Sequence, residues 1–144
     1  MHEAPLTRTD RVLTVLLGVA FLLAGAAKIY DPAAFALSIA RMRILPMAAV
    51  GTVAILLPWI EVVAGAALFV PKFRTPAAKL LLGLLIAFTV ILGISFLRGT
   101  AGSCGCFGSS DLYINRPPFA MVRNISMMIT AAFVIRAGPP GAAP

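Results

Sequence analysis

The sequence predicts an all-α integral membrane protein: a bundle of four transmembrane helices with a cysteine-containing loop between the third and the fourth. Hydrophobic residues make up 60% of the 144 residues and charged residues only 12%, which is half of the roughly 25% found in soluble domains. The apolar residues gather in four long runs. The basic residues stand singly or in pairs at the ends of these runs, where they anchor helices at the lipid headgroups.

The four runs predict helices at residues 12–28, 47–70, 77–97 and 119–136. A bilayer core of ~30 Å requires ~20 residues of helix, so the second and third runs are long enough, whereas the first and fourth need flanking residues. The first run also resembles a signal peptide, and as a retained helix it places both termini on one side. One membrane domain is expected, with a flexible Pro/Gly/Ala tail at residues 137–144.

Small residues in the runs predict where helices pack closely together. A helix with a small residue at its interface lets the neighbouring backbone approach, which is the main way in which helices associate within lipid. The residues expected at such seams are Gly18, Gly25, Gly51, Gly65 and the pair formed by Gly83 and Ala87.

The basic residues indicate a membrane partner and an orientation. The formal net charge is +7, but no basic stripe with interleaved aromatic residues is present, which argues against nucleic-acid binding. The side that holds the termini carries Arg8, Arg11, Lys72, Arg74, Lys79 and Arg136; the other side carries Lys28, Arg41, Arg43, Arg98, Arg116 and Arg123. If Lys28 and Arg123 lie inside the bundle, the excess favours cytoplasmic termini, and the cysteine loop faces a compartment where disulfides persist.

Glu61 is the most costly residue in the sequence, because it lies within the second run, in LLPWIEVVAGAALF. A carboxylate near the middle of a bilayer has to be protonated, paired or directed into a water-filled cavity. Pro58 is expected to bend the helix one turn earlier, and the adjacent Trp59 is suited to stack on a planar ligand or simply to fill space. Glu61 therefore either forms an internal ion pair that fixes the helix register or handles protons and contacts a ligand.

Lys28 and Arg123 are the candidate partners of Glu61. Lys28 ends the first run, where the alternative is a snorkelling anchor at the interface. Arg123 lies ~8 Å inside the fourth run by helix rise, at a depth where a guanidinium is paired or snorkels. Asn124 beside it adds hydrogen-bond donors.

Cys104 and Cys106 are the only cysteines, and they form a CxC motif in the loop AGSCGCFGSSD. A disulfide across one residue closes a small ring and is easily reduced, and it removes almost no loop entropy. Such a bond suits electron transfer better than a structural role. A structural or incidental pair and a Cu(I) site remain alternatives; two thiolates are too few for zinc, whereas soft Cu(I) accepts thiolates and thioethers.

The single cysteine pair also limits how electrons can move. With no second pair in the chain, a relay has to run directly from a partner thiol to this pair and then to an acceptor that is not a thiol. In a membrane, the natural acceptor is a quinone. The residues available to bind it are Glu61, Trp59, Lys28, Arg123 and Asn124, and no covalently bound cofactor is expected.

Four segments of the sequence together resemble the MauE branch of the DoxX-like family. They are FLLAGAAKIYDPAAF, LPWIEVVAGAALF, CGCFG and VRNISMM, and the resemblance extends from about residue 12 to residue 135. It implies a four-helix protein of the bacterial inner membrane with a periplasmic cysteine loop. It also implies Cys104 and Cys106 as the redox pair. The named member of the family is needed to mature methylamine dehydrogenase and works with a thioredoxin-like partner.

The leading hypothesis is a membrane thiol–disulfide electron carrier that supports disulfide formation or maturation of a periplasmic protein. Cys104 and Cys106 would carry the chemistry, relaying electrons between a thioredoxin-like partner and the quinone pool. The alternatives are a non-catalytic accessory subunit or assembly factor of a larger membrane complex, and a Cu(I)-binding protein that uses the same two cysteines.

Overall fold

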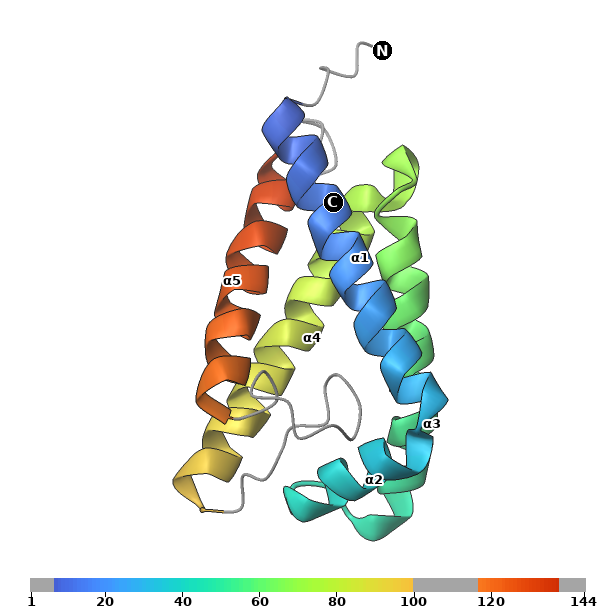
Figure 1. Ribbon diagram of the computed structural model, residues 1–144, viewed down its shortest axis with the longest axis vertical. Coiled ribbons are helices and arrows are strands. Elements are labelled where there is room, and N and C mark those ends of the chain that lie inside the picture. Colours follow the sequence, from blue (N-terminus) through green and yellow to red (C-terminus); the bar gives the residue numbers. More distant parts are fainter. Residues whose placement is uncertain (1–6, 100–116, 138–144) are drawn as a thin grey trace.

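The computed structural model describes residues 7–99 and 117–137, which form five helices (Figure 1). The helices are α1 (Arg8–Tyr30), α2 (Pro32–Arg41), α3 (Met47–Ala67), α4 (Pro71–Leu97) and α5 (Pro117–Arg136). All except α2 include a stretch that is long and apolar enough to cross a membrane. The chain is therefore an all-α, multi-pass membrane protein, as predicted. The predicted cysteine loop and the tail from residue 138 onward lie outside the described residues.

Three of the long helices begin earlier than the hydrophobic runs predict: α5 by two residues, and α1 and α4 by more. α1 starts four residues before residue 12, because Thr7 and Asp10 form a capping box. The Thr7 hydroxyl accepts from the Asp10 amide at 3.3 Å, and the Asp10 carboxylate accepts from the Thr7 amide at 3.2 Å. α4 starts six residues before residue 77, because Pro71 occupies a first-turn position that needs no N–H donor. A hydropathy pattern does not detect the polar residues with which a helix begins.

The short helix α2 is an element that the apolar runs do not predict. Asp31 begins it: its carboxylate accepts from the Ala34 amide at 2.9 Å, and Pro32 follows at the first helical position. Ten residues are too few to span lipid. α2 instead packs against α3 at the end of the bundle where α1 ends (Figure 1).

Replacing Asp31 with alanine is expected to lower the free energy of unfolding by about 0.5–2 kcal/mol. The reason is that the first turn of α2 loses the acceptor for the Ala34 amide. Equilibrium unfolding in detergent micelles, followed by circular dichroism, measures the change. Asp31→Asn keeps an acceptor oxygen and should lose much less; an equal loss in both variants would contradict the capping role.

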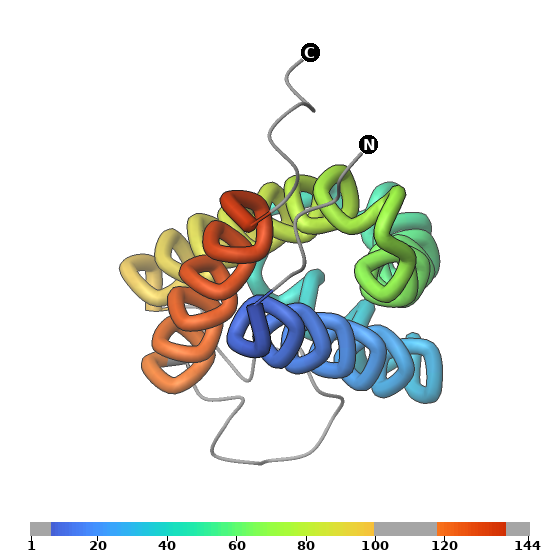
Figure 2. The backbone as a smooth tube through the Cα atoms, turned by 90° about the horizontal axis from the view of Figure 1, so that it is seen from above, coloured from blue at the N-terminus to red at the C-terminus, as the bar shows by residue number. Residues whose placement is uncertain are grey.

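The four long helices form a ring in which α1 packs along α3, α3 along α4, α4 along α5, and α5 along α1 (Figure 2). At 20 to 27 residues, these helices are about 30–40 Å long, which matches a bilayer and part of its headgroup layer. Their inner faces form an apolar core of Leu17, Phe21, Ala64, Leu68, Ala77, Ala78, Leu81, Leu85, Ala131 and Val134. Large apolar side chains such as Leu16, Val63 and Phe133 are exposed on the outside, where a membrane protein meets lipid.

Glycines bring α1 and α3 into close contact, as the sequence predicts for three of the five. A Cβ added at Gly25 would lie 2.6 Å from Val62 Cγ2 and 3.0 Å from the Pro58 carbonyl oxygen; one added at Gly65 would lie 3.2 Å from the Gly18 carbonyl oxygen. A side chain at these positions would force the helices apart.

The prediction was wrong for Gly51 and Gly83. A Cβ at either position would meet nothing within 4 Å, and both residues, like Ala87, are exposed. The spacing of small residues along one helix does not say which face of that helix meets a neighbour.

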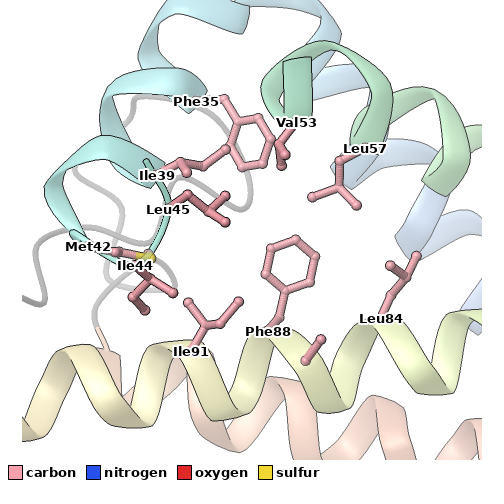
Figure 3. A pocket seen from close by; sticks show the side chains of 11 residues that line it. Phe35, Ile39, Met42, Ile44, Leu45, Val53, Leu57, Leu84, Phe88 and Ile91 are labelled. Atoms are coloured by element: carbon pink, nitrogen blue, oxygen red, sulfur yellow. The ribbon is translucent and has the colours of Figure 1, made fainter. Parts of the chain in front are cut away.

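An apolar cavity of about 170 Å³ lies between α2, α3, α4 and the chain that joins α2 to α3 (Figure 3). Its walls are entirely hydrophobic side chains: Phe35, Ile39, Met42, Ile44, Leu45, Val53, Leu57, Leu84, Ala87, Phe88 and Ile91. The unpredicted helix α2 supplies part of these walls, through Phe35 and Ile39.

Candidate functional site

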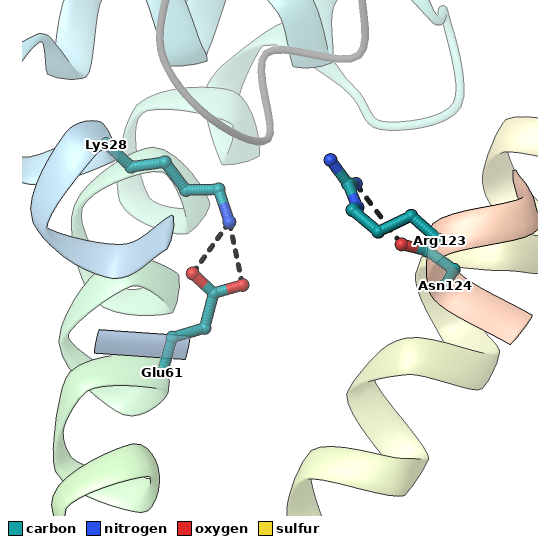
Figure 4. Close-up of polar contacts among 4 residues, drawn as sticks. All are labelled: Lys28, Glu61, Arg123 and Asn124. Carbon is teal, nitrogen blue, oxygen red and sulfur yellow. Dashed lines mark hydrogen bonds and ion pairs between the residues drawn. The ribbon is translucent and has the colours of Figure 1, made fainter. Parts of the chain in front are cut away.

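A buried ion pair joins the last turn of α1 to the second half of α3. The Nζ atom of Lys28 lies 2.8 Å and 2.7 Å from the two carboxylate oxygens of Glu61, and each side chain is only 2% exposed (Figure 4). A buried charge is costly unless it is paired and hydrogen-bonded. Of the two partners predicted for Glu61, the structure shows Lys28 bonded to it, so Lys28 is not a snorkelling anchor.

Two phenylalanine rings enclose the Lys28 ammonium. Nζ lies 5.2 Å from the ring centroid of Phe35 on α2 and 5.3 Å from that of Phe88 on α4. These distances are within the range of cation–π attraction, which strengthens where water is excluded. Four helices therefore contribute to holding this one charge.

A second polar group, on the facing side, ties α5 to α4. Arg123 Nη2 donates to Asn124 Oδ1 at 3.2 Å, and Asn124 Nδ2 donates to the hydroxyl oxygen of Thr89 at 3.4 Å. The Thr89 hydroxyl in turn donates to the carbonyl oxygen of Leu85 at 2.7 Å. Asn124 is 3% exposed, so its amide is positioned within the bundle by α4.

The two polar groups border one small cavity of about 30 Å³, which Lys28, Glu61, Arg123 and Asn124 line together with apolar side chains. In Figure 4, the Arg123 guanidinium and the Lys28–Glu61 pair lie on opposite sides of this space. It is large enough for one water molecule, which needs about 10–15 Å³ and several polar partners. The structure thus brings together four of the five residues predicted to bind a ligand.

Trp59 is the fifth predicted residue, and the structure does not bring it to this cavity. Its side chain is 54% exposed and lines an outer groove between α3 and α4, together with Phe73 and Leu80. Residues two apart on a helix do not face the same way. With Glu61 directed inward, Trp59 consequently faces outward.

Thr89, Phe35 and Phe88 are site residues that sequence reasoning missed. Thr89 and Phe88 lie in a long apolar run, and Phe35 lies in the segment that forms α2. From sequence alone, a phenylalanine or threonine within an apolar run is interpreted as a residue that only packs against its neighbours. No local signal distinguishes these three residues, because their role comes from which side chain on another helix they meet.

Comparison with known proteins identifies the family. The model of the family "Methylamine utilisation protein MauE" matches residues 6–137, nearly the whole chain. The chain belongs to the MauE family. A curated relative, the methylamine utilization protein MauE of Paracoccus denitrificans, is 31% identical over 134 residues, which cover 92% of this chain and 70% of the relative. No solved structure matched the chain.

The predicted redox pair of this MauE-family protein, Cys104 and Cys106, lies outside the described residues. The segment that carries it leaves α4 after Leu97 and enters α5 at Pro117. Both of these helix ends lie at the same end of the bundle as the end of α1 (Figure 1). Within residues 7–99 and 117–137, no group of three or more His, Cys, Asp or Glu side chains is placed to hold a metal ion.

Proposed function

We propose that this MauE-family protein is a membrane thiol–disulfide electron carrier that serves methylamine utilisation, with Cys104 and Cys106 as its redox pair. The pathway is suggested by the family description and by the name of the relative from Paracoccus denitrificans. The chemistry is suggested by the CxC motif, whose short spacing favours a readily reduced disulfide.

In the proposed reaction, a thiolate of a thioredoxin-like partner attacks the Cys104–Cys106 disulfide and forms a mixed disulfide. The second thiol of the partner resolves it, so the partner leaves oxidised and the cysteine pair is left as two thiols. The two thiols then pass two electrons and two protons to a lipid-soluble quinone. The disulfide forms again, and the quinone becomes a quinol.

The single observation that carries the proposal is the buried polar cavity inside the bundle, which Lys28 lines from the last turn of α1 and Arg123 lines from the first half of α5, the helix that the cysteine segment enters. A bundle of apolar helices does not need an internal ion pair, because apolar side chains of similar volume hold a core at least as well. Ionisable residues inside a membrane mark proton or ligand sites by default. Lys28 and Glu61 are suited to exchange a proton, and Arg123 and Asn124 to orient an oxygen atom of a ligand.

The distribution of charge supports a periplasmic position for the cysteine segment in a bacterial inner membrane. Lys28 is buried and Arg123 lines the inner cavity, so neither counts as a residue of a loop. Six basic residues then belong to the end of the bundle with the termini and four to the other end. The positive-inside rule favours cytoplasmic termini, which leaves the cysteines on the side where disulfides persist.

A redox titration tests the proposal. Purified protein is equilibrated at a series of thiol/disulfide potentials, and its free thiols are counted by alkylation and gel shift. We expect one two-electron transition, and we expect Cys104→Ser or Cys106→Ser to accumulate a mixed disulfide with the partner in cells. A pair that stays fully oxidised or fully reduced at every potential between strong oxidant and strong reductant would refute the proposal.

The double variant Cys104→Ser/Cys106→Ser separates the proposal from its alternatives. We expect cells that carry it to lose growth on methylamine, whereas an accessory subunit or assembly factor that acts only by packing would retain growth and co-purify with its complex. Metal analysis of the purified, reduced protein addresses the Cu(I) alternative, which requires stoichiometric copper.

A further inference from the structure

The outer groove between α3 and α4 faces the lipid and has no occupant from within the described helices. Its volume is about 670 Å³, far larger than that of either internal cavity, and apolar side chains of both helices line it. Three of them, Trp59, Val63 and Phe73, are at least half exposed. Along this groove, the molecule that fills it in a membrane has to be apolar.

The depth of the groove favours a lipid chain over a transmembrane helix as the occupant. Its lining on α3 extends from Leu56 to Ala67, the last residue of that helix, which is ~16 Å by helix rise. One leaflet contributes half of a hydrocarbon core of ~30 Å. An acyl chain of one leaflet therefore fits the groove from end to end, whereas a helix that crosses the membrane would extend over about twice that depth.

Basic side chains gather at the end of the groove where α3 leads into α4 (Figure 1). Lys72 Nζ lies 5.8 Å from the ring centroid of Phe73, which lines the groove. Arg74 Nε donates to the carbonyl oxygen of Leu68 at 3.4 Å, and this bond holds the guanidinium at the connection between the two helices. Two cations thus lie where the head of a lipid in the groove would be.

Lys79 belongs to the same basic group. Lys72, Pro76 and Lys79 are spaced four and three residues apart, so they share one face of α4, and Pro76 lines the groove. Side chains on a helix lean toward its N-terminus, and a lysine inside a membrane extends its ammonium to the interface. Lys79, which is exposed, therefore directs its charge toward Lys72.

The segment that carries these three charges contains no acidic residue. The sequence has neither aspartate nor glutamate between Glu61 and Asp111. In the first turn of α4, which the structure describes in full, no side chain caps the helix, and the positive end of the helix dipole adds to the basic group. Unbalanced positive charge at the end of an apolar groove complements a molecule with an anionic head and an apolar chain.

We propose that the outer groove binds an anionic phospholipid, with one acyl chain along the groove and its phosphate at Lys72, Arg74 and Lys79. Basic residues near a membrane surface attract anionic lipid, and arginine and lysine form charge-assisted hydrogen bonds with phosphate oxygens. A zwitterionic phospholipid fits less well, because its head brings a cation of its own. The inference goes beyond the proposed function, since it assigns a ligand to a face that the redox chemistry does not use.

The fluorescence of Trp59 reports on the groove directly, because Trp59 lines it and is the only tryptophan. The full chain is reconstituted in phosphatidylcholine vesicles in which a small fraction of the lipid carries bromine atoms in its acyl chains, which quench tryptophan on contact. That fraction is phosphatidylglycerol in one series and phosphatidylcholine in the other. We expect the brominated phosphatidylglycerol to quench Trp59 severalfold more effectively at the same mole fraction, and the difference to shrink at high salt.

Lys72→Gln/Lys79→Gln should remove most of this preference, since each basic residue near the surface contributes up to about fivefold to the affinity for anionic lipid. Arg8→Gln/Arg136→Gln is the matched control. It removes the same charge at the same end of the bundle, from exposed residues of α1 and α5 that do not line the groove, and it should keep the preference. Circular dichroism verifies folding, and Lys72→Gln alone, with an expected loss of about fivefold, replaces a double variant that does not fold.

Three results would overturn the assignment. Equal quenching by the two brominated lipids in the parent would show that the groove does not select an anionic head. An equal loss of preference in both double variants would show a general attraction of anionic lipid to a basic surface. Quenching by neither lipid would show that a second copy of the chain or another protein covers the groove. The measurement does not involve the cysteines, so its outcome and that of the redox titration are independent.

Discussion

Replacing Lys28 with methionine is expected to lower the free energy of unfolding by about 3–5 kcal/mol, the usual cost of breaking a buried ion pair. Methionine fills nearly the same volume but removes the ammonium that lies 2.7 Å from the Glu61 carboxylate. Equilibrium unfolding by a denaturing detergent in mixed micelles, followed by circular dichroism, measures the loss.

The double variant Lys28→Met/Glu61→Gln provides the decisive control. With both charges removed, most of the stability should return, because replacing a whole buried ion pair by neutral groups is often close to neutral. Lys79→Met changes an exposed lysine on α4 and should stay within about 0.5 kcal/mol of the parent. If the double variant is as unstable as Lys28→Met, the loss of stability in Lys28→Met does not come from leaving the Glu61 carboxylate without its ion-pair partner.

Replacing Gly25 with alanine is expected to lower the free energy of unfolding by about 1–3 kcal/mol, the typical cost of overpacking a tight contact. The new Cβ would lie 3.0 Å from the carbonyl oxygen of Pro58 and 2.6 Å from Val62 Cγ2. A backbone atom cannot rotate away as a side chain does. α1 and α3 therefore have to separate, and the same unfolding measurement reports the loss.

Gly51→Ala and Gly83→Ala are the matched controls for the Gly25 variant. Each adds the same methyl group within a helix, but in open space, and the lower backbone entropy of the unfolded chain favours stability by up to about 1 kcal/mol. A loss in these variants as large as that in Gly25→Ala would show that the glycines matter for the helix itself and not for the contact between α1 and α3.

The number and type of the spanning helices follow from the sequence because the bilayer imposes a length and a polarity on them. Four long apolar runs can satisfy their backbones in lipid only as helices, and four of the described helices meet that description. The length and polarity of the bilayer do not predict α2. Its ten residues are held by the Asp31 cap and by packing on α3, neither of which leaves a signature in hydropathy.

The polar part of the candidate site was also predictable, because charge inside a membrane is costly enough to be noticed one residue at a time. Glu61, Lys28 and Arg123 stand out in apolar sequence. The apolar part was not. Phe35 and Phe88 acquire their role only when α2 and α4 bring both rings close to one ammonium. Trp59 is the reverse case: a conspicuous residue whose side chain faces outward from its helix.

The Lys28–Glu61 pair also bears on how the protein enters its membrane. The two residues are 33 positions apart, and at 5–20 residues per second the ribosome needs about 2 to 7 s to add the second after the first. During that interval α1 carries Lys28 in its last turn, and the carboxylate that later binds this lysine has not yet been made. Glu61 lies farther from the ends of its helix than Lys28 does, and it is synthesised after Lys28. The order of synthesis thus produces the carboxylate, which lies deeper in its helix, only after the ammonium that neutralises it.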